Sequence, residues 1–122
     1  MPSILVVDDD EDTCRDMADL FGDLGFVVDA ADDGHMALKK EVGQQPYGLG
    51  LLDLRMTEMD GLTLCRHLRR LRPGMVTMII TAYGAGSLAE TAYDAGARHI
   101  LSKPVDFPRL LALVEEALQP AK

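Results

Sequence analysis

Short apolar runs alternate with amphipathic stretches five times along this chain of 122 residues. The apolar runs predict strands at Ile4–Asp8, Phe26–Ala30, Leu49–Asp53, Val76–Thr81 and His99–Ser102. The stretches between them carry apolar residues at helical spacing and predict helices over Glu11–Leu24, His35–Gly43, Leu62–Leu71, Ser87–Ala95 and Phe107–Leu118. Strands that are nearly continuously apolar are typical of a parallel sheet covered by helices on both faces.

Right-handed crossovers leave few topologies for five such units. We therefore expect an α/β fold of the flavodoxin-like type, a doubly wound five-stranded parallel sheet in the order 2-1-3-4-5. The length suits one hydrophobic core, so we expect a single domain over residues 1–122, with 119–122 as a short tail or the start of a linker. Ligands of such sheets bind beyond the carboxyl ends of the strands, and the residues there are the candidates for function.

The charge of the chain limits its partners. The formal net charge is −8, so we expect no direct binding to nucleic acid, which depends on neutralising phosphates. One basic stretch, RHLRRLR at Arg66–Arg72, is more typical of the solvated face of a helix, with a surface for docking a partner as the alternative.

The sequence also indicates in which compartment the chain is expected to work. No apolar run approaches the roughly 18 residues that a membrane span needs, and no secretory signal is expected at the start. Cys14 and Cys65 are far apart and lack metal-binding spacing, which favours a reduced protein in the cytoplasm.

Polar residues stand at the carboxyl ends of four predicted strands. Asp8 ends the first and Asp9 follows it, Asp53 ends the third, Thr81 ends the fourth and Lys103 follows the fifth. In a doubly wound sheet these residues converge on one crevice. Carboxylates around a crevice suit Mg²⁺, a lysine and a hydroxyl suit phosphate oxygens, and a carboxylate can itself become phosphorylated. The next acids, Asp10 to Asp12, are expected to begin a helix whose dipole stabilises them.

The residues at these strand ends resemble the receiver domain of two-component response regulators. The matching segments are ILVVDDD, LLDLRMTEMDG, ITA and SKP, in the family's order and over essentially the whole chain. The resemblance implies that Asp53 accepts a phosphoryl group, and that Thr81 and Lys103 contact it. It also implies a cis peptide bond between Lys103 and Pro104.

The resemblance further implies a metal site and a signalling role. Asp8, Asp9 and Asp53, with the backbone carbonyl of Arg55, would bind Mg²⁺ or Mn²⁺. A sensor histidine kinase, or a phosphotransfer protein, would supply the phosphoryl group from a phosphohistidine. The chain would then be a switch that dephosphorylates itself and is otherwise not an enzyme. A phosphorylation-dependent homodimer is compatible with this role.

Three features depart from the family's usual pattern. Thr57 replaces a proline, and Ile100 stands where an aromatic residue is common. The bulky Arg55 and Tyr83 lie two residues beyond Asp53 and Thr81, and we expect them to screen the phosphoryl group from water. These departures leave open a second function, that of a receiver-like protein-interaction module that phosphorylation does not control.

A third function is that of a phosphatase of the haloacid-dehalogenase type. Asp8 and Asp10 have the D-x-D spacing of such enzymes. Those enzymes also carry a further acidic motif well beyond their lysine, whereas here only Asp106 follows Lys103 before the last predicted helix. The sequence therefore favours the receiver interpretation.

Overall fold

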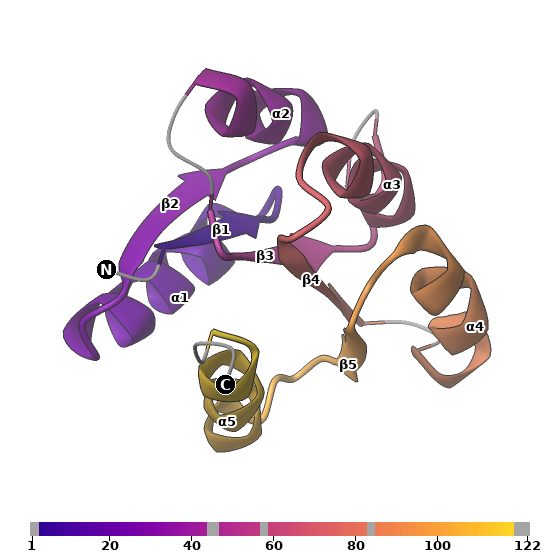
Figure 1. Cartoon of the computed structure of the whole chain (residues 1–122). Coiled ribbons are helices and arrows are strands. Elements are labelled where there is room, and N and C mark those ends of the chain that lie inside the picture. Colours follow the sequence, from indigo (N-terminus) through magenta and orange to yellow (C-terminus); the bar gives the residue numbers. More distant parts are fainter. Residues whose placement is uncertain (1–2, 44–46, 57–58, 83–84, 119–122) are drawn as a thin grey trace.

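Strands and helices alternate in the computed structural model, which describes residues 3–43, 47–56, 59–82 and 85–118 (Figure 1). The strands are β1 (Ser3–Val7), β2 (Val27–Ala31), β3 (Leu49–Asp53), β4 (Val76–Thr81) and β5 (His99–Ser102). The helices are α1 (Glu11–Asp23), α2 (Gly34–Gly43), α3 (Gly61–Leu71), α4 (Ala85–Ala95) and α5 (Phe107–Ala117). Every boundary lies within two residues of its predicted position.

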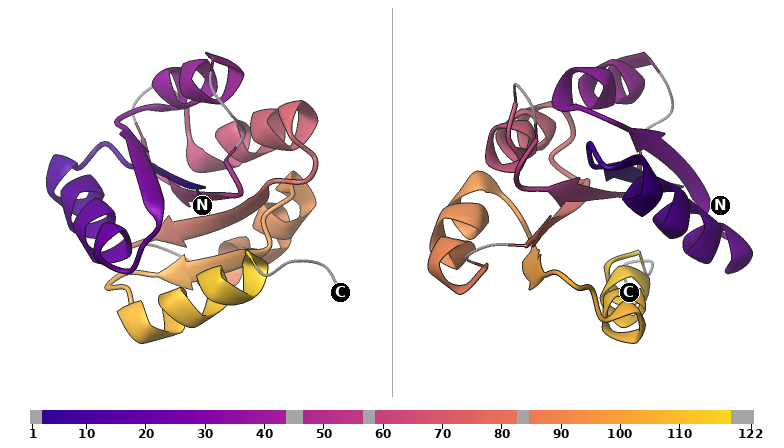
Figure 2. Two further views of the ribbon diagram at one scale, coloured as in Figure 1. Left: turned by 60° about the vertical axis from the view of Figure 1, so that its left-hand side comes forward. Right: turned by 180° about the vertical axis from the view of Figure 1, so that it is seen from behind.

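The five strands form one sheet in the order β2-β1-β3-β4-β5, and every neighbouring pair is parallel. Helices α1 and α5 cover one face, and α2, α3 and α4 cover the other (Figures 1 and 2). The predicted doubly wound α/β fold is confirmed. The order reverses between β1 and β3, so a crevice is expected beyond their carboxyl ends.

Two apolar layers hold the sheet between its helices. Successive residues of a strand face opposite sides, so Leu5 and Val7 of β1 pack toward α2 and α3, while Ile4 and Val6 pack toward α1 and α5. The second layer includes Phe21 of α1, whose ring contacts that of Phe107 at the start of α5. Burial on both faces explains why the strands read as continuous apolar runs.

Polar side chains and glycines set the ends of the helices. The carboxylates of Asp10, Asp60 and Asp106 cap α1, α3 and α5 by accepting hydrogen bonds from backbone amides of the first turn. Gly25 and Gly96, which follow α1 and α4, have φ angles of 95° and 111°, a conformation that favours glycine and is common just after a helix. Among the described residues, no helix is long and apolar enough to cross a membrane.

Candidate functional site: a carboxylate crevice at the end of β1 and β3

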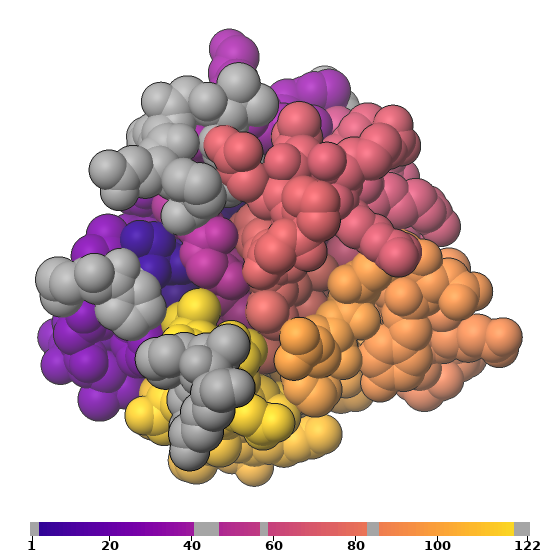
Figure 3. Space-filling view, viewed as in Figure 1, coloured from indigo at the N-terminus to yellow at the C-terminus, as the bar shows by residue number. Residues whose placement is uncertain are grey.

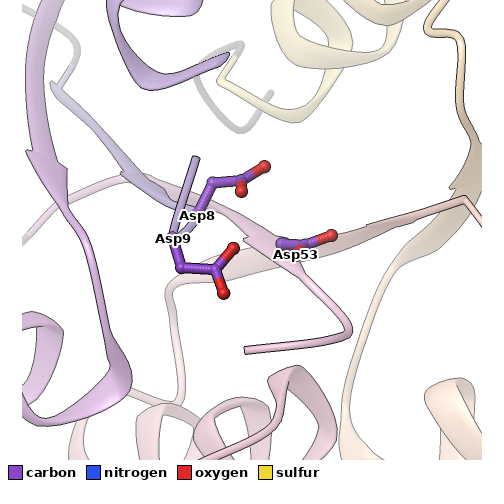
Figure 4. Close-up of side chains that lie close together, drawn as sticks. All are labelled: Asp8, Asp9 and Asp53. Carbon is purple, nitrogen blue, oxygen red and sulfur yellow. The ribbon is translucent and has the colours of Figure 1, made fainter. Parts of the chain in front are cut away.

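Three carboxylates gather beyond the carboxyl ends of β1 and β3 (Figure 4). Asp53 is the last residue of β3 and continues the face of the strand that carries Leu51. Asp8 and Asp9 follow β1 directly. One oxygen of each carboxylate lies within 4.8 Å of the other two. The predicted convergence of these three residues is thus confirmed.

The crevice is buried on one side and open on the other. The exposed fractions of Asp8 and Asp53 are 4% and 8%, whereas Asp9 is exposed. Three hard oxygen ligands at one such point match the chemistry that Mg²⁺ requires. The open side, next to Asp9, leaves room for the water or phosphate oxygens that complete its shell. The residues present therefore fit a divalent cation.

Lys103 brings the only side-chain cation found within 4.0 Å of these carboxylates in the described part of the chain. Its Nζ lies 3.1 Å from Oδ2 of Asp8 and 3.2 Å from Oδ1 of Asp53. The peptide bond between Lys103 and Pro104 is cis, as predicted. Burial alone would lower the pKa of Lys103, but hydrogen bonds and charges from Asp8 and Asp53 outweigh it and raise that pKa. Lys103 therefore stays charged.

One ammonium does not balance the carboxylates. Burial raises the pKa of Asp53, and the charge of Asp8 raises it further, while Lys103 opposes the shift. Asp53 is thus held as a carboxylate in surroundings that favour its neutral form. A divalent cation or a transferred phosphoryl group bound with one would relieve this imbalance.

Asp8 and Asp10 have different tasks. Asp8 accepts a hydrogen bond at Oδ1 from the amide of Asp10, 2.9 Å away, which fixes its second oxygen toward Lys103. The carboxylate of Asp10 turns to α1, where it accepts hydrogen bonds from the amide of Asp12 and the hydroxyl of Thr13. Asp10 therefore acts as a helix cap, and the D-x-D pair of a phosphatase does not assemble.

Thr81 and Arg55 lie at or just beyond the carboxyl ends of β4 and β3. Thr81 ends β4, is buried, and its carbonyl accepts a hydrogen bond of 2.8 Å from the amide of Lys103. Arg55 lies two residues after Asp53 and has an exposed side chain. The roles of the Thr81 hydroxyl and of the Arg55 carbonyl stay predictions. Thr57 and Tyr83 lie outside the described residues.

Ile100 lies in β5, opposite Ile79 of β4, and is partly buried. It packs against the core cluster on the side of α2, α3 and α4, as does Leu88 of α4. An aliphatic side chain thus occupies the position where the family commonly has an aromatic ring.

Gly61 allows the start of α3 to pack closely against the end of β3. A Cβ on Gly61 would collide with the backbone carbonyl of Asp53. The amide of Gly61 also donates a hydrogen bond of 2.8 Å to the carbonyl of Leu54. The first residue of α3 thus packs directly under the candidate phosphoacceptor. The Asp-Gly pair in the motif MTEMDG was the available signal, because glycine permits such close approach of two backbones.

A cavity of about 260 Å³ adjoins the crevice between α1 and the segment after β5. Its walls are mainly apolar and include Met17, Leu20 and Phe107. Its polar lining residues are Asp8, Thr13, Asp16, Asp53 and Lys103. Asp53 thus has water-accessible space on this side too, and the cavity is part of the same site.

The fold and the crevice define the class of the molecule, a doubly wound α/β domain with a cluster of carboxylates at its switch point. The sequence matches the family described as "Response regulator receiver domain" over residues 4–115. The chain belongs to this family.

Proteins of similar sequence are named as transcriptional regulators or response regulators. The transcriptional regulatory protein ZraR of Escherichia coli (strain K12) is 40% identical over 94% of this chain, which covers 26% of that protein. A response regulator receiver protein of Anaeromyxobacter sp. (strain Fw109-5) is 37% identical over 93% of this chain, which covers 47% of it. The chain thus spans about a quarter to a half of the length of these relatives.

Solved structures share the fold. The response regulator TrrA from Thermotoga maritima, in complex with Mg²⁺-BeF, gives a TM-score of 0.86 with 28% identity, over 97% of this chain and 100% of that one. A response regulator from Burkholderia pseudomallei with a phosphorylated aspartic acid, calcium ion and citrate gives 0.85 with 29% identity, over 98% of this chain and 67% of the other.

Proposed function

We propose that this chain is a phosphorylation-controlled switch in which Asp53 accepts a phosphoryl group with the help of Mg²⁺. The observation that carries the proposal is the buried Asp53 carboxylate, with Asp8 and Asp9 within 4.8 Å on one side and Lys103 at 3.2 Å on the other. Membership of the receiver family supports the same role.

The proposed donor is a phosphohistidine of a sensor histidine kinase or of a phosphotransfer protein. An oxygen of Asp53 attacks phosphorus, the nitrogen–phosphorus bond of the donor breaks, and its electron pair returns to the imidazole, which takes up a proton from water. Mg²⁺ bound by Asp8, Asp9, Asp53 and the Arg55 carbonyl would supply charge neutralisation for the phosphoryl oxygens. Hydrolysis of the aspartyl phosphate then returns the carboxylate and inorganic phosphate.

Lys103 and Thr81 have roles that follow from their positions. Lys103 already bridges Asp8 and Asp53, so a phosphoryl group on Asp53 would give its ammonium a new anionic partner. The Thr81 hydroxyl, at the end of β4, is proposed to bind the phosphoryl group. That contact would shift the start of α4, whose residues follow Thr81 closely. Phosphorylation would thereby bias a two-state balance of α4.

This chemistry is confined to the chain's own phosphorylation and dephosphorylation. We propose that residues 1–122 act as one receiver domain, and that the two buried free cysteines, Cys14 and Cys65, fit a reducing cytoplasm. An output domain or downstream protein would receive the signal, and a phosphorylation-dependent homodimer is one form that this output can take.

Incubation with Mg²⁺ and acetyl phosphate, followed by intact mass measurement, tests the proposal. We expect one phosphoryl group on the wild type, none on Asp53→Asn, and none after removal of Mg²⁺ with EDTA. Asp19→Asn, an exposed change on α1 with the same loss of charge, is the control and should be phosphorylated normally. No incorporation in the wild type would favour the interaction module, and incorporation in Asp53→Asn would place the acceptor elsewhere.

A further inference from the structure

Arginines gather on one helix of this acidic protein. Four of its eight arginines fall between Arg66 and Arg72, although the net charge of the chain is −8. Three of them are exposed and line an open hollow of about 500 Å³ at the ends of α3 and α4. We call it the arginine hollow, and it is lined by Arg66, Arg69, Arg70, Pro73, Asp94 and Ala95.

The arginine hollow lies at the opposite end of the molecule from the carboxylate crevice. In a parallel sheet the helices run back against the strands, so the C-terminal ends of α3 and α4 lie at the amino ends of the strands. Figure 3 shows this end, with atoms of α3 and α4 adjoining at its right. The hollow is therefore a surface separate from the site of phosphorylation.

Hydrogen bonds between α3 and the end of α4 hold the two helices together at the hollow. Nη1 of Arg69 donates a hydrogen bond of 3.2 Å to the carbonyl of Asp94, in the last turn of α4. The thiol of Cys65 donates to the carbonyl of Ala95, 3.5 Å away. The side chain of Arg69 also covers Gly96, where a Cβ would collide with it. Arg69 is thus a structural residue that caps α4.

The other two arginines have no such task. Among the residues that the structure describes, neither Arg66 nor Arg70 forms an ion pair. Arg70 lies in the last turn of α3, where the helix dipole favours a cation, but Arg66 lies one turn earlier. Arg66 is also three and four residues from Arg69 and Arg70, a spacing at which like charges destabilise a helix slightly. Stability of the fold does not explain this concentration of charge.

The shape and charge of the hollow select the kind of ligand. Pockets for small molecules are enclosed, whereas this hollow is open to solvent, and four of its six lining residues are charged. A long nucleic acid would also run across the acidic remainder of the surface, which repels it. A short anionic segment feels mainly the nearby arginines, because charges beyond about 8 Å are screened at physiological salt.

We propose that the arginine hollow binds an acidic segment of a protein partner. Guanidinium groups bind carboxylates in a two-pronged geometry, and two of them, on Arg66 and Arg70, are available one turn apart. Asp94 is the only carboxylate among the lining residues. Since the hollow lies away from Asp53, binding does not require Mg²⁺ or phosphorylation.

An NMR titration of the ¹⁵N-labelled chain tests this proposal. The probe is an acetylated and amidated ten-residue peptide in which glutamate alternates with alanine, and the control peptide has glutamine in place of glutamate. We expect shifts of the amides of α3 and of Asp94 and Ala95 with the glutamate peptide only. The shifts should be the same with and without Mg²⁺ and beryllofluoride, so failure here is distinct from failure of the phosphorylation proposal.

A matched pair of variants separates the hollow from overall charge. The arginine variant combines Arg66→Gln with Arg70→Gln, and the lysine variant combines Lys39→Gln with Lys40→Gln. Each variant loses two positive charges, which takes the net charge from −8 to −10. We expect the arginine variant to raise the Kd for the glutamate peptide about tenfold, the loss of roughly 1.4 kcal/mol. The lysine variant should leave that Kd within about twofold, because Lys39 and Lys40 lie on α2 and do not line the hollow.

Four outcomes would overturn the proposal. These are no shifts at the hollow, equal binding of the glutamine peptide, equal weakening in both variants, and tighter binding of a ten-nucleotide single-stranded DNA at the same residues. If the double arginine variant does not show the dispersed spectrum of a folded chain, Arg70→Gln alone replaces it. That single change should raise the Kd about threefold, and an unchanged Kd would count against the hollow.

Discussion

Neutralising Asp53 should make the metal-free chain more stable. Asp53 is 8% exposed and shares its crevice with two other carboxylates. Ionisation of Asp53 in the folded state is therefore unfavourable, as the raised pKa of this group indicates. Asparagine has the same shape, lacks the charge, and keeps an oxygen that can accept a hydrogen bond from Lys103.

The distances set the size of the effect. With an effective dielectric constant of about 20, the ammonium of Lys103 at 3.2 Å attracts the Asp53 charge by about 5 kcal/mol. Asp8, within 4.8 Å, repels it by at least about 3.5 kcal/mol, and the exposed Asp9 adds a further repulsion that solvent screens. Burial of a carboxylate costs several kcal/mol more. The balance is a net cost, and we expect Asp53→Asn to raise the free energy of unfolding by about 1–2 kcal/mol.

Urea unfolding at pH 7 in EDTA measures this difference, with Asp19→Asn as the control for net charge. The control should lie within about 0.5 kcal/mol of the wild type, as exposed changes do. The advantage of Asp53→Asn should shrink as pH falls through the raised folded pKa of Asp53, and vanish below its ordinary value of 3.8, where Asp53 is protonated in both states. A lower stability of Asp53→Asn at pH 7 without Mg²⁺ would refute the reasoning.

Three further experiments probe the surroundings of Asp8 and Asp53. Gly61→Ala should lower the free energy of unfolding by about 1–3 kcal/mol and slow phosphorylation, because the added Cβ meets the Asp53 carbonyl. Urea unfolding measures the first effect and intact mass the second, and wild-type values in both would contradict the packing. Lys103→Met should destabilise the metal-free chain, since Asp8 and Asp53 lose their cation; unchanged stability would mean that the observed ion pairs contribute nothing. Burial and Asp8 raise the pKa of Cys14 to about 11, so iodoacetamide should label this thiol slowly at pH 8 in a Cys65→Ser variant, whereas rapid labelling would contradict that environment.

The fold was predictable because two kinds of signal in the sequence agree: the apolar runs that form strands, and the residues that begin and end the helices. The apolar runs fix the strands, and the parity of Ile4 and Val6 against Leu5 and Val7 assigns each strand residue to one layer. Asp10 and Gly25 then set the ends of α1, as their residue types indicate. Helix α4 is predicted to begin at Ser87 but begins at Ala85, because Ser87, a residue type that commonly marks the start of a helix, lies here inside the first turn.

The site was predictable only in part. The order of a parallel sheet brings Asp8, Asp9 and Asp53 together, so their convergence follows from topology. The double contact of Lys103 and the packing of Gly61 under Asp53 depend on distances between elements, which no pattern along the chain records. The arginine hollow likewise needs the ends of α3 and α4 in contact, although the basic stretch itself is visible in the sequence.

The response of Thr81 and α4 to beryllofluoride tests the central claim most directly. Beryllofluoride with Mg²⁺ should mimic the aspartyl phosphate, and NMR spectra would follow the amides of Thr81, Ile100 and α4. We predict that these signals shift in the wild type and stay unchanged in Asp53→Asn. Identical spectra with and without beryllofluoride, or the same shifts in Asp53→Asn, would contradict a switch controlled at Asp53.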